Sequence, residues 1–113
     1  MQPELATYAD FTRLDLRAGT IVAVEPFAQA RVPAYKLTLD FGELGLRRSS
    51  AQLVANYTPE TLVGRRILAV VNFPPKRIAG FASEVLVLGA SDAAGNVVLA
   101  SFERDVPDGA RLY

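Results

Sequence analysis

The sequence predicts an all-β protein, a closed barrel of five strands with one short helix between the third and fourth strands. Short apolar or alternating segments rich in β-branched residues recur along the 113 residues. The 8 glycines and 7 prolines are scattered and mark turns between these segments. A chain of this length has room for one ordinary core. We therefore expect residues 1–113 to form a single domain.

The first expected strand covers residues 14–27 and is unusually long. It contains β-branched and apolar residues around Gly19 and ends near Pro26. A glycine inside a strand favours a bulge or bend, so we expect one at Gly19. Such a long, coiled strand is what a small barrel needs in order to close.

A hairpin and a short helix are expected next. Residues 35–41 alternate apolar and polar side chains, and the glycines of residues 42–45 favour a tight turn into a partner strand at 46–53. Farther along, Thr58 has the properties of an N-cap and is followed by a proline and an acid. This pattern predicts a helix over residues 59–63 that ends at a glycine.

The second half of the chain adds strands. The apolar run 66–73 is typical of a strand buried on both faces. Residues 84–90 and 96–101 are predicted to be strands joined by a turn at 91–95, and the carboxyl end a short strand or edge. Five or more short strands with one small helix after the third describe a barrel of the OB type more economically than a sandwich.

The charge is neutral overall but unevenly distributed. The chain has 12 basic and 12 acidic residues, and residues 31–77 hold eight of the bases and three of the acids, which leaves +5 there. In an OB barrel the second and third strands and the loop after the helix commonly line a nucleic-acid groove. The basic segment coincides with those elements, and the alternative is that these are ordinary solvated charges.

Residues 74–81 are the most unusual segment. A stiff double proline precedes the cations Lys76 and Arg77, and Ile78 and Phe81 flank a glycine. This composition is typical of a binding loop, because prolines leave little entropy to lose and the cations can meet phosphates or carboxylates. In the alternative interpretation Ile78 and Phe81 close the end of the barrel and the cations point to water.

Residues that carry common enzymatic chemistry are scarce. The chain has no cysteine and no histidine, and it lacks the glycine-rich phosphate and dinucleotide motifs. Asp15, Asp40 and Glu84 do not have the spacing of a metal site. We expect no catalysis, no metal and no cofactor. The first ten residues lack a signal-peptide pattern and no apolar run is long enough to span a bilayer, so we expect a cytoplasmic protein.

Four segments together resemble the tRNA-binding-domain family. They are DLRAGTI at 15–21, YKL at 35–37, RSSAQ at 48–52 and the stretch VNFPPKRIAGFASEVLVLG at 71–89. The resemblance covers about residues 10–113, and within the family it is to a branch of stand-alone, export-related chaperones. It implies an OB fold with a short amino-terminal helix, a homodimer and no catalysis.

The chaperone resemblance implies binding of unfolded or export-destined polypeptides and cooperation with the secretion machinery. The candidate peptide contacts are Phe73, Lys76, Arg77, Ile78 and Phe81. In the alternative the chain binds tRNA by its shape, as other members of the family do. The candidate RNA contacts are Lys36, Arg47, Arg48, Ser50, Lys76 and Arg77, with Phe81 as a base stacker.

One motif departs from the tRNA-binding branch, and one further class of function stays open. The tRNA-binding branch usually has a Ser-x-Gly-Met segment after the fourth strand, whereas this chain has Ser83-Glu84-Val85. A purely structural dimer, whose partner protein carries the function, is the third hypothesis.

Overall fold

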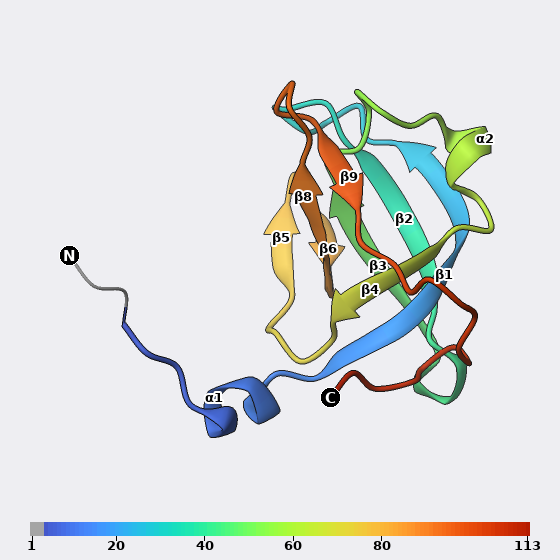
Figure 1. The fold of residues 1–113 in the computed structure, drawn as a ribbon. Helices are drawn as coiled ribbons and strands as arrows, with labels where there is room; N and C mark the ends of the chain where they lie inside the picture. The colour runs from blue at the N-terminus through green and yellow to red at the C-terminus, as the bar shows by residue number, and fades with distance from the viewer. Residues whose placement is uncertain (1–3) are drawn as a thin grey trace.

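Five antiparallel strands form the main sheet of the structure, a computed structural model that describes residues 4–113. Their order is β3–β2–β1–β4–β7, with bounds Leu46–Ala51, Tyr35–Asp40, Leu16–Pro26, Arg66–Val70 and Leu86–Val87. Two hairpins complete the barrel (Figure 1): β5 (Lys76–Ile78) with β6 (Phe81–Ser83), and β8 (Gly89–Ser91) with β9 (Val97–Leu99). This nearly closed barrel confirms the predicted all-β fold of the OB type.

The barrel closes where β3 meets the segment after β6. The Ser49 hydroxyl is buried and donates to the carbonyl of Val85 at 3.0 Å. One residue on, the Ser50 backbone N–H donates to Oγ of Ser83 at 3.0 Å. These side-chain bonds satisfy polar groups that a regular strand pair would satisfy through its backbone, so they hold the barrel together at its least regular seam.

The long strand β1 bends at a different place from the one expected. Its register with β2 shifts between Ile21 and Ala23, so the irregularity lies beyond Gly19, and the predicted position was wrong. Gly19 has another role, because a Cβ there would lie 2.7 Å from Cε1 of Phe41. Because Gly19 has no side chain, the fully buried Phe41 ring can pack directly against β1.

The predicted helix is present as α2 (Pro59–Leu62), between β3 and β4. The Thr58 side chain accepts from the N–H of Thr61, and Oγ1 of Thr61 accepts from the N–H of Thr58. This reciprocal capping satisfies two of the helix's free donors. Leu62 is fully buried and anchors the helix to the barrel.

The main core fills the inside of the barrel, and a second, smaller cluster of buried residues is separate from it. The main cluster contains inward-facing residues of β1, β2 and β4 together with residues from α2 and the loops: Ile21, Tyr35, Leu37, Leu39, Phe41, Leu53, Leu62, Ile67, Ala69 and Val85. The smaller cluster is Phe27, Ala34 and Phe81, with Ala30 and Ile78 packed against it. The second cluster fixes the β5–β6 hairpin to the barrel.

Two segments differ from their predicted form. Residues 74–81 are not an extended loop: they contain most of the β5–β6 hairpin, which turns at Ala79 (φ 48°) and Gly80 (φ 83°). Positive φ at both central residues matches the twist of a two-residue hairpin. The strand expected at 66–73 ends at Val70, and the one expected at 84–90 is divided into β7 and β8.

The expected amino-terminal helix is α1 (Tyr8–Arg13), which lies outside the barrel (Figure 1) and buries none of its residues. Asn72 connects it to the sheet, because its Nδ2 donates to the carbonyl of Arg13 and its Oδ1 accepts from the N–H of Asp15, both at 2.8 Å. A bridge between Arg17 and Arg111 brings the carboxyl end beside β1. Within residues 4–113 no helix has the length and apolar character needed to cross a membrane.

Candidate functional site

Two cations and two aromatic rings meet on the outer face of β2 and β3. Nζ of Lys36 lies 4.8 Å from the ring centre of Phe27 and 5.3 Å from that of Phe81. Cζ of Arg48 lies 5.0 Å from the Phe81 ring centre. These four residues form what we call the cation–aromatic cluster. Ser50 faces the same side, since it is paired with Lys36 across the two strands.

The cluster also contains an acidic partner. Nη2 of Arg48 lies 2.8 Å from Oε1 of Glu25, and Glu25 is paired with Lys36 in the register of β1 and β2. Among residues 4–113, Nε of Arg48 is one of two buried side-chain polar atoms without a hydrogen-bond partner. The guanidinium is therefore held by a ring on one side and a carboxylate on another.

Two of the remaining candidate RNA contacts, Arg47 and Arg77, do not join this cluster. Arg47 is adjacent to Arg48 on β3, so its side chain leaves the opposite face of the strand and donates to the carbonyl of Leu44 at 3.3 Å. Arg77 is exposed near the hairpin turn, where it donates to the carbonyl of Gly80 at 3.4 Å. The structure thus brings together Lys36, Arg48 and Ser50 from the predicted RNA set.

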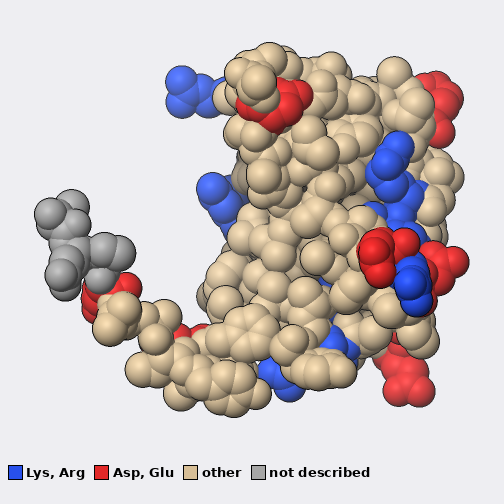
Figure 2. Space-filling view, viewed as in Figure 1, with Lys and Arg blue, Asp and Glu red and all other residues tan. Residues whose placement is uncertain are grey.

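The basic segment of the sequence is divided in space. Arg66 forms an ion pair with Asp108 at 3.3 Å, and Arg65 lies over the ring of Tyr57 at 5.2 Å. On the face shown in Figure 2, basic and acidic side chains are interspersed over a largely uncharged surface. The excess of five positive charges therefore does not produce one continuous basic groove on that face.

A small apolar pocket lies beside the hairpin, with a volume of about 210 Å³. We call it the Phe73 pocket, and it is lined by Phe73, Pro74, Lys76, Ser83, Glu84, Val85 and Leu86. Phe73 and Leu86 remain 44% and 50% exposed. Large apolar side chains left half in water beside a concave surface are typical of a binding site.

The predicted peptide contacts fall into two groups. Phe73 and Lys76 line the Phe73 pocket. Phe81 is only 9% exposed and packs edge-on against Phe27, with ring centres 5.4 Å apart, and Ile78 packs against the same cluster. Ile78 and Phe81 therefore pack against the protein's own residues and do not line the Phe73 pocket.

The sequence prediction missed several contributors, among them Glu25, Phe27 and Leu86. Leu86 lies in an apolar run that predicted only a strand. Glu25 and Phe27 lie 11 and 9 residues before Lys36, and only the antiparallel pairing of β1 with β2 brings them to it. No local pattern signals such a contact.

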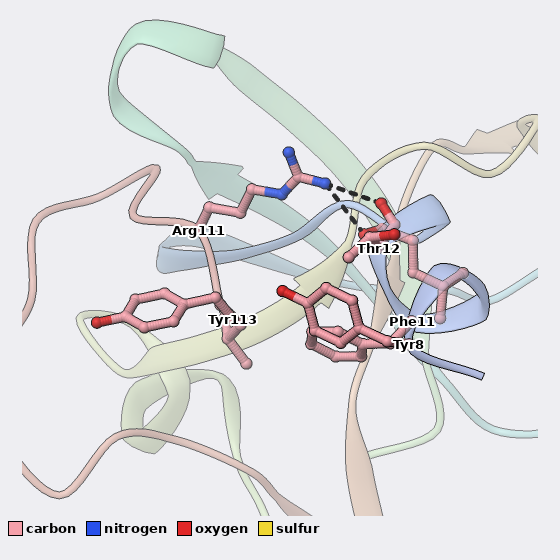
Figure 3. Close-up of a pocket in the computed structure, with 7 residues that line it drawn as sticks. Tyr8, Phe11, Thr12, Arg111 and Tyr113 are labelled. Atoms are coloured by element: carbon pink, nitrogen blue, oxygen red, sulfur yellow. Dashed lines mark hydrogen bonds between the residues drawn. The ribbon is translucent and has the colours of Figure 1, made fainter. Parts of the chain in front are cut away.

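A second concave surface lies between α1 and the carboxyl end, with a volume of about 360 Å³. Figure 3 shows Tyr8 and Phe11 of α1 and Tyr113 of the last segment around it, with Arg111 donating to the carbonyl of Thr12 at 3.1 Å. Tyr8 is 77% exposed and Tyr113 is fully exposed. We call this the terminal surface.

An ion pair near the terminal surface lowers the pKa of Asp15. Nε of Arg17 lies 2.6 Å from Oδ1 of Asp15, and Arg111 lies 3.6 Å from the same oxygen. The hydrogen bond from Arg17 lowers the pKa of Asp15 below its ordinary value, and the charges of Arg17 and Arg111 add to this effect against a smaller cost of burial. In the part of the chain that the structure describes, no three acidic side chains gather in a way that could hold a metal ion.

An OB-type barrel with cations on its outer face and an apolar pocket beside it is an arrangement typical of ligand-binding modules. Residues 16–111 match the family described as a putative tRNA binding domain, and the chain belongs to this family. The resemblance seen in the sequence is thereby confirmed.

Solved structures place the chain near one branch of the family. A CsaA chaperone from Bacillus anthracis str. Ames is 54% identical with a TM-score of 0.92, and the match covers 97% of this chain and all of that one. A CsaA chaperone protein from Picrophilus torridus is 46% identical with a TM-score of 0.89, over 96% and 100%. The chain is a CsaA-type member of the family.

Longer relatives contain a similar domain. A methionine–tRNA ligase from Methanococcoides burtonii is 34% identical over 110 residues, which are 97% of this chain and 16% of that protein. The chain thus spans only a small part of such curated relatives. The family model and the two chaperone structures are not catalytic domains.

Proposed function

We propose that this protein is a non-catalytic molecular chaperone that binds unfolded or export-destined polypeptides. The observation that carries the proposal is the Phe73 pocket, where Phe73 and Leu86 are about half exposed beside a concave apolar surface. The close likeness to two structures titled as CsaA chaperones supports it.

The pocket would bind an apolar side chain of an unfolded client. Removing Phe73 and Leu86 from water supplies the driving force, since each square ångström of apolar surface buried contributes roughly 25 cal/mol. Pro74 holds the rim with little entropy to lose. Lys76 and Glu84 at the rim would pair with charged groups on either side of the apolar residue, and Arg77 would extend the positive side.

Ile78 and Phe81 would contribute indirectly to this site. Both pack in the cluster that fixes the β5–β6 hairpin to the barrel, so they would keep Lys76 and the pocket wall in place. In this proposal they support the peptide site and do not touch the client.

A homodimer would increase client affinity. The terminal surface leaves Tyr8 and Tyr113 in water, and we propose that a second copy of the chain covers it. Two linked weak sites bind one extended polypeptide more tightly than a single site does. Sedimentation of the protein and of its Tyr8→Ser variant tests this. A parent dimer that dissociates in the variant supports the proposal. A parent that is monomeric, or a variant that remains as dimeric as the parent, overturns it.

The cellular role proposed with this function is support of protein secretion from the cytoplasm. The polypeptide would be held unfolded until the secretion machinery accepts it. Weak, multivalent apolar contacts suit this task, because the client must also be released.

The decisive test of the polypeptide site is suppression of aggregation of a heat-denatured luciferase. The double variant Phe73→Ser with Leu86→Ser should lose most of the suppression while its melting temperature stays within about 2 °C of the parent, since both side chains are half exposed. Val63→Ser, another exposed apolar residue, is the matched control and should retain suppression. Equal suppression by all three proteins would remove the Phe73 pocket from the site.

Binding of tRNA is the second candidate function. The family match and the shared position of Lys36, Arg48 and Ser50 on one face favour it. Affinity for bulk tRNA at two salt concentrations, with an unfolded polypeptide as competitor, separates the two functions. Tight, strongly salt-dependent binding that the polypeptide does not displace would establish the RNA function in place of the chaperone function.

A further inference from the structure

The outer face of β2 and β3 is occupied by its own side chains. Lys36 covers the rings of Phe27 and Phe81, and Arg48 covers Phe81 as well. Glu25 in turn holds Arg48 through a contact of 2.8 Å. Nη2 of Arg48 and the two aromatic rings, which a nucleic acid would use on this face, already have partners within the chain.

RNA makes two demands on such a surface. Its phosphates bind lysine and arginine side chains that are not already paired with a carboxylate, and its bases stack on aromatic rings whose faces are uncovered. A carboxylate meets a guanidinium with the same charge-assisted geometry as a phosphate does. Glu25 therefore occupies on Arg48 the position that a phosphate oxygen would take.

We propose that Glu25 is a specificity-determining residue that disfavours nucleic acid on this face by competing with phosphate for Arg48. Selectivity between ligand classes commonly depends on such a repulsive element as well as on attractive contacts. This inference goes beyond the proposed polypeptide function, because it concerns a class of ligand, nucleic acid, that the protein binds less well.

The exposure of the pair determines the size of the effect. The side chains of Arg48 and Glu25 are 39% and 60% exposed, and ion pairs in such surroundings are weak and displaceable. Glu25 therefore lowers RNA affinity by a moderate factor and leaves residual binding that can be measured.

The test measures binding of bulk tRNA by the full chain and its Glu25→Gln variant over a range of salt concentrations. We expect the variant to bind about 2- to 5-fold more tightly. The slope of log affinity against log salt should steepen by about 0.7 to 0.9, which corresponds to one more phosphate contact.

Two controls separate this mechanism from a general change of charge. Glu43→Gln removes an exposed carboxylate of η1 (Gly42–Leu44) that takes part in none of the ion pairs found in residues 4–113, and should raise affinity by less than twofold. Arg48→Met keeps an unbranched side chain at this position and removes the charge. In this background the Glu25→Gln gain should disappear.

Two results would overturn the proposal: equal gains from Glu25→Gln and Glu43→Gln, or a Glu25→Gln gain that persists with Arg48→Met. Aggregation suppression by Glu25→Gln is measured in parallel and is expected to equal that of the parent. Because the RNA readout does not depend on polypeptide binding, the specificity proposal and the chaperone proposal fail independently.

Discussion

Arg48 and Glu84 are joined by two hydrogen bonds at the seam of the barrel. The Glu84 N–H donates to the carbonyl of Arg48 at 2.7 Å, and the Arg48 N–H donates to Oε1 of Glu84 at 2.9 Å. The carboxylate thus replaces the backbone carbonyl that a regular strand pair would offer. The partner of the Glu84 carboxylate is therefore the backbone of a cationic residue.

Replacing Glu84 by alanine should destabilise the barrel by about 1 to 2 kcal/mol, because the partly buried N–H of Arg48 loses its acceptor. Glu84→Gln keeps an acceptor oxygen and should recover most of this loss. Urea unfolding measures both, with Glu103→Ala as a control at a fully solvated residue. Equal destabilisation by alanine and glutamine would show that the charge matters and the acceptor does not.

Gly19→Ala should cost about 1 to 3 kcal/mol of stability, because the new Cβ meets the buried Phe41 ring at 2.7 Å. Phe41→Leu destabilises by itself through the cavity that it leaves. In the double variant the two losses should be less than additive, since the smaller side chain relieves the clash. Strict additivity in a thermodynamic cycle would contradict the assigned contact.

Phe81→Ser and Phe73→Ser should differ sharply although both remove a phenylalanine from the same stretch. The Phe81 ring is 9% exposed and packs on Phe27, so its loss should cost about 3 kcal/mol or more. Phe73 is 44% exposed, and its loss should change stability by about 0.5 kcal/mol or less. Thermal melting of the two variants measures this difference. Similar melting temperatures would contradict the prediction, because they would mean that both side chains contribute equally to stability.

Stability should fall in acid partly through Asp15. The pKa of Asp15 is lowered in the folded protein, so the stabilisation from its ion pair with Arg17 is complete above the ordinary value of 3.8. It is lost as the pH falls through the lower folded pKa. Asp15→Asn should therefore be less stable than the parent at pH 7, and the difference should shrink below about pH 4.

Urea unfolding at neutral and acidic pH measures this difference. Asp105→Asn, at an exposed acid that takes part in none of the ion pairs within residues 4–113, is the control and should show a smaller dependence. A stability difference between Asp15→Asn and the parent that does not change with pH would exclude the proposed titration.

Several elements were predictable because their signals are local. The alternation that predicted β2, the turn of η1 and the capping sequence of α2 each act over a few residues, and the structure contains all three close to their predicted positions. The position of the irregularity in β1 was not predictable from Gly19. That glycine is required by a ring more than twenty residues away in the chain, and a contact of this kind leaves no local pattern.

The candidate site also has features that the sequence predicted and features that depend on contacts between distant residues. The sequence alone determined the fold class, the family and the pool of residues from which the binding surfaces are built, because side-chain periodicity and turn chemistry are carried by neighbouring residues. Only the tertiary structure decided which members of that pool meet: it joined Lys36 and Arg48 to Phe81, turned Arg47 away, buried Phe81 and left Phe73 half exposed. These outcomes depend on strand register, because pairing sets which distant residues share a face and a shift of one residue would reverse every side chain.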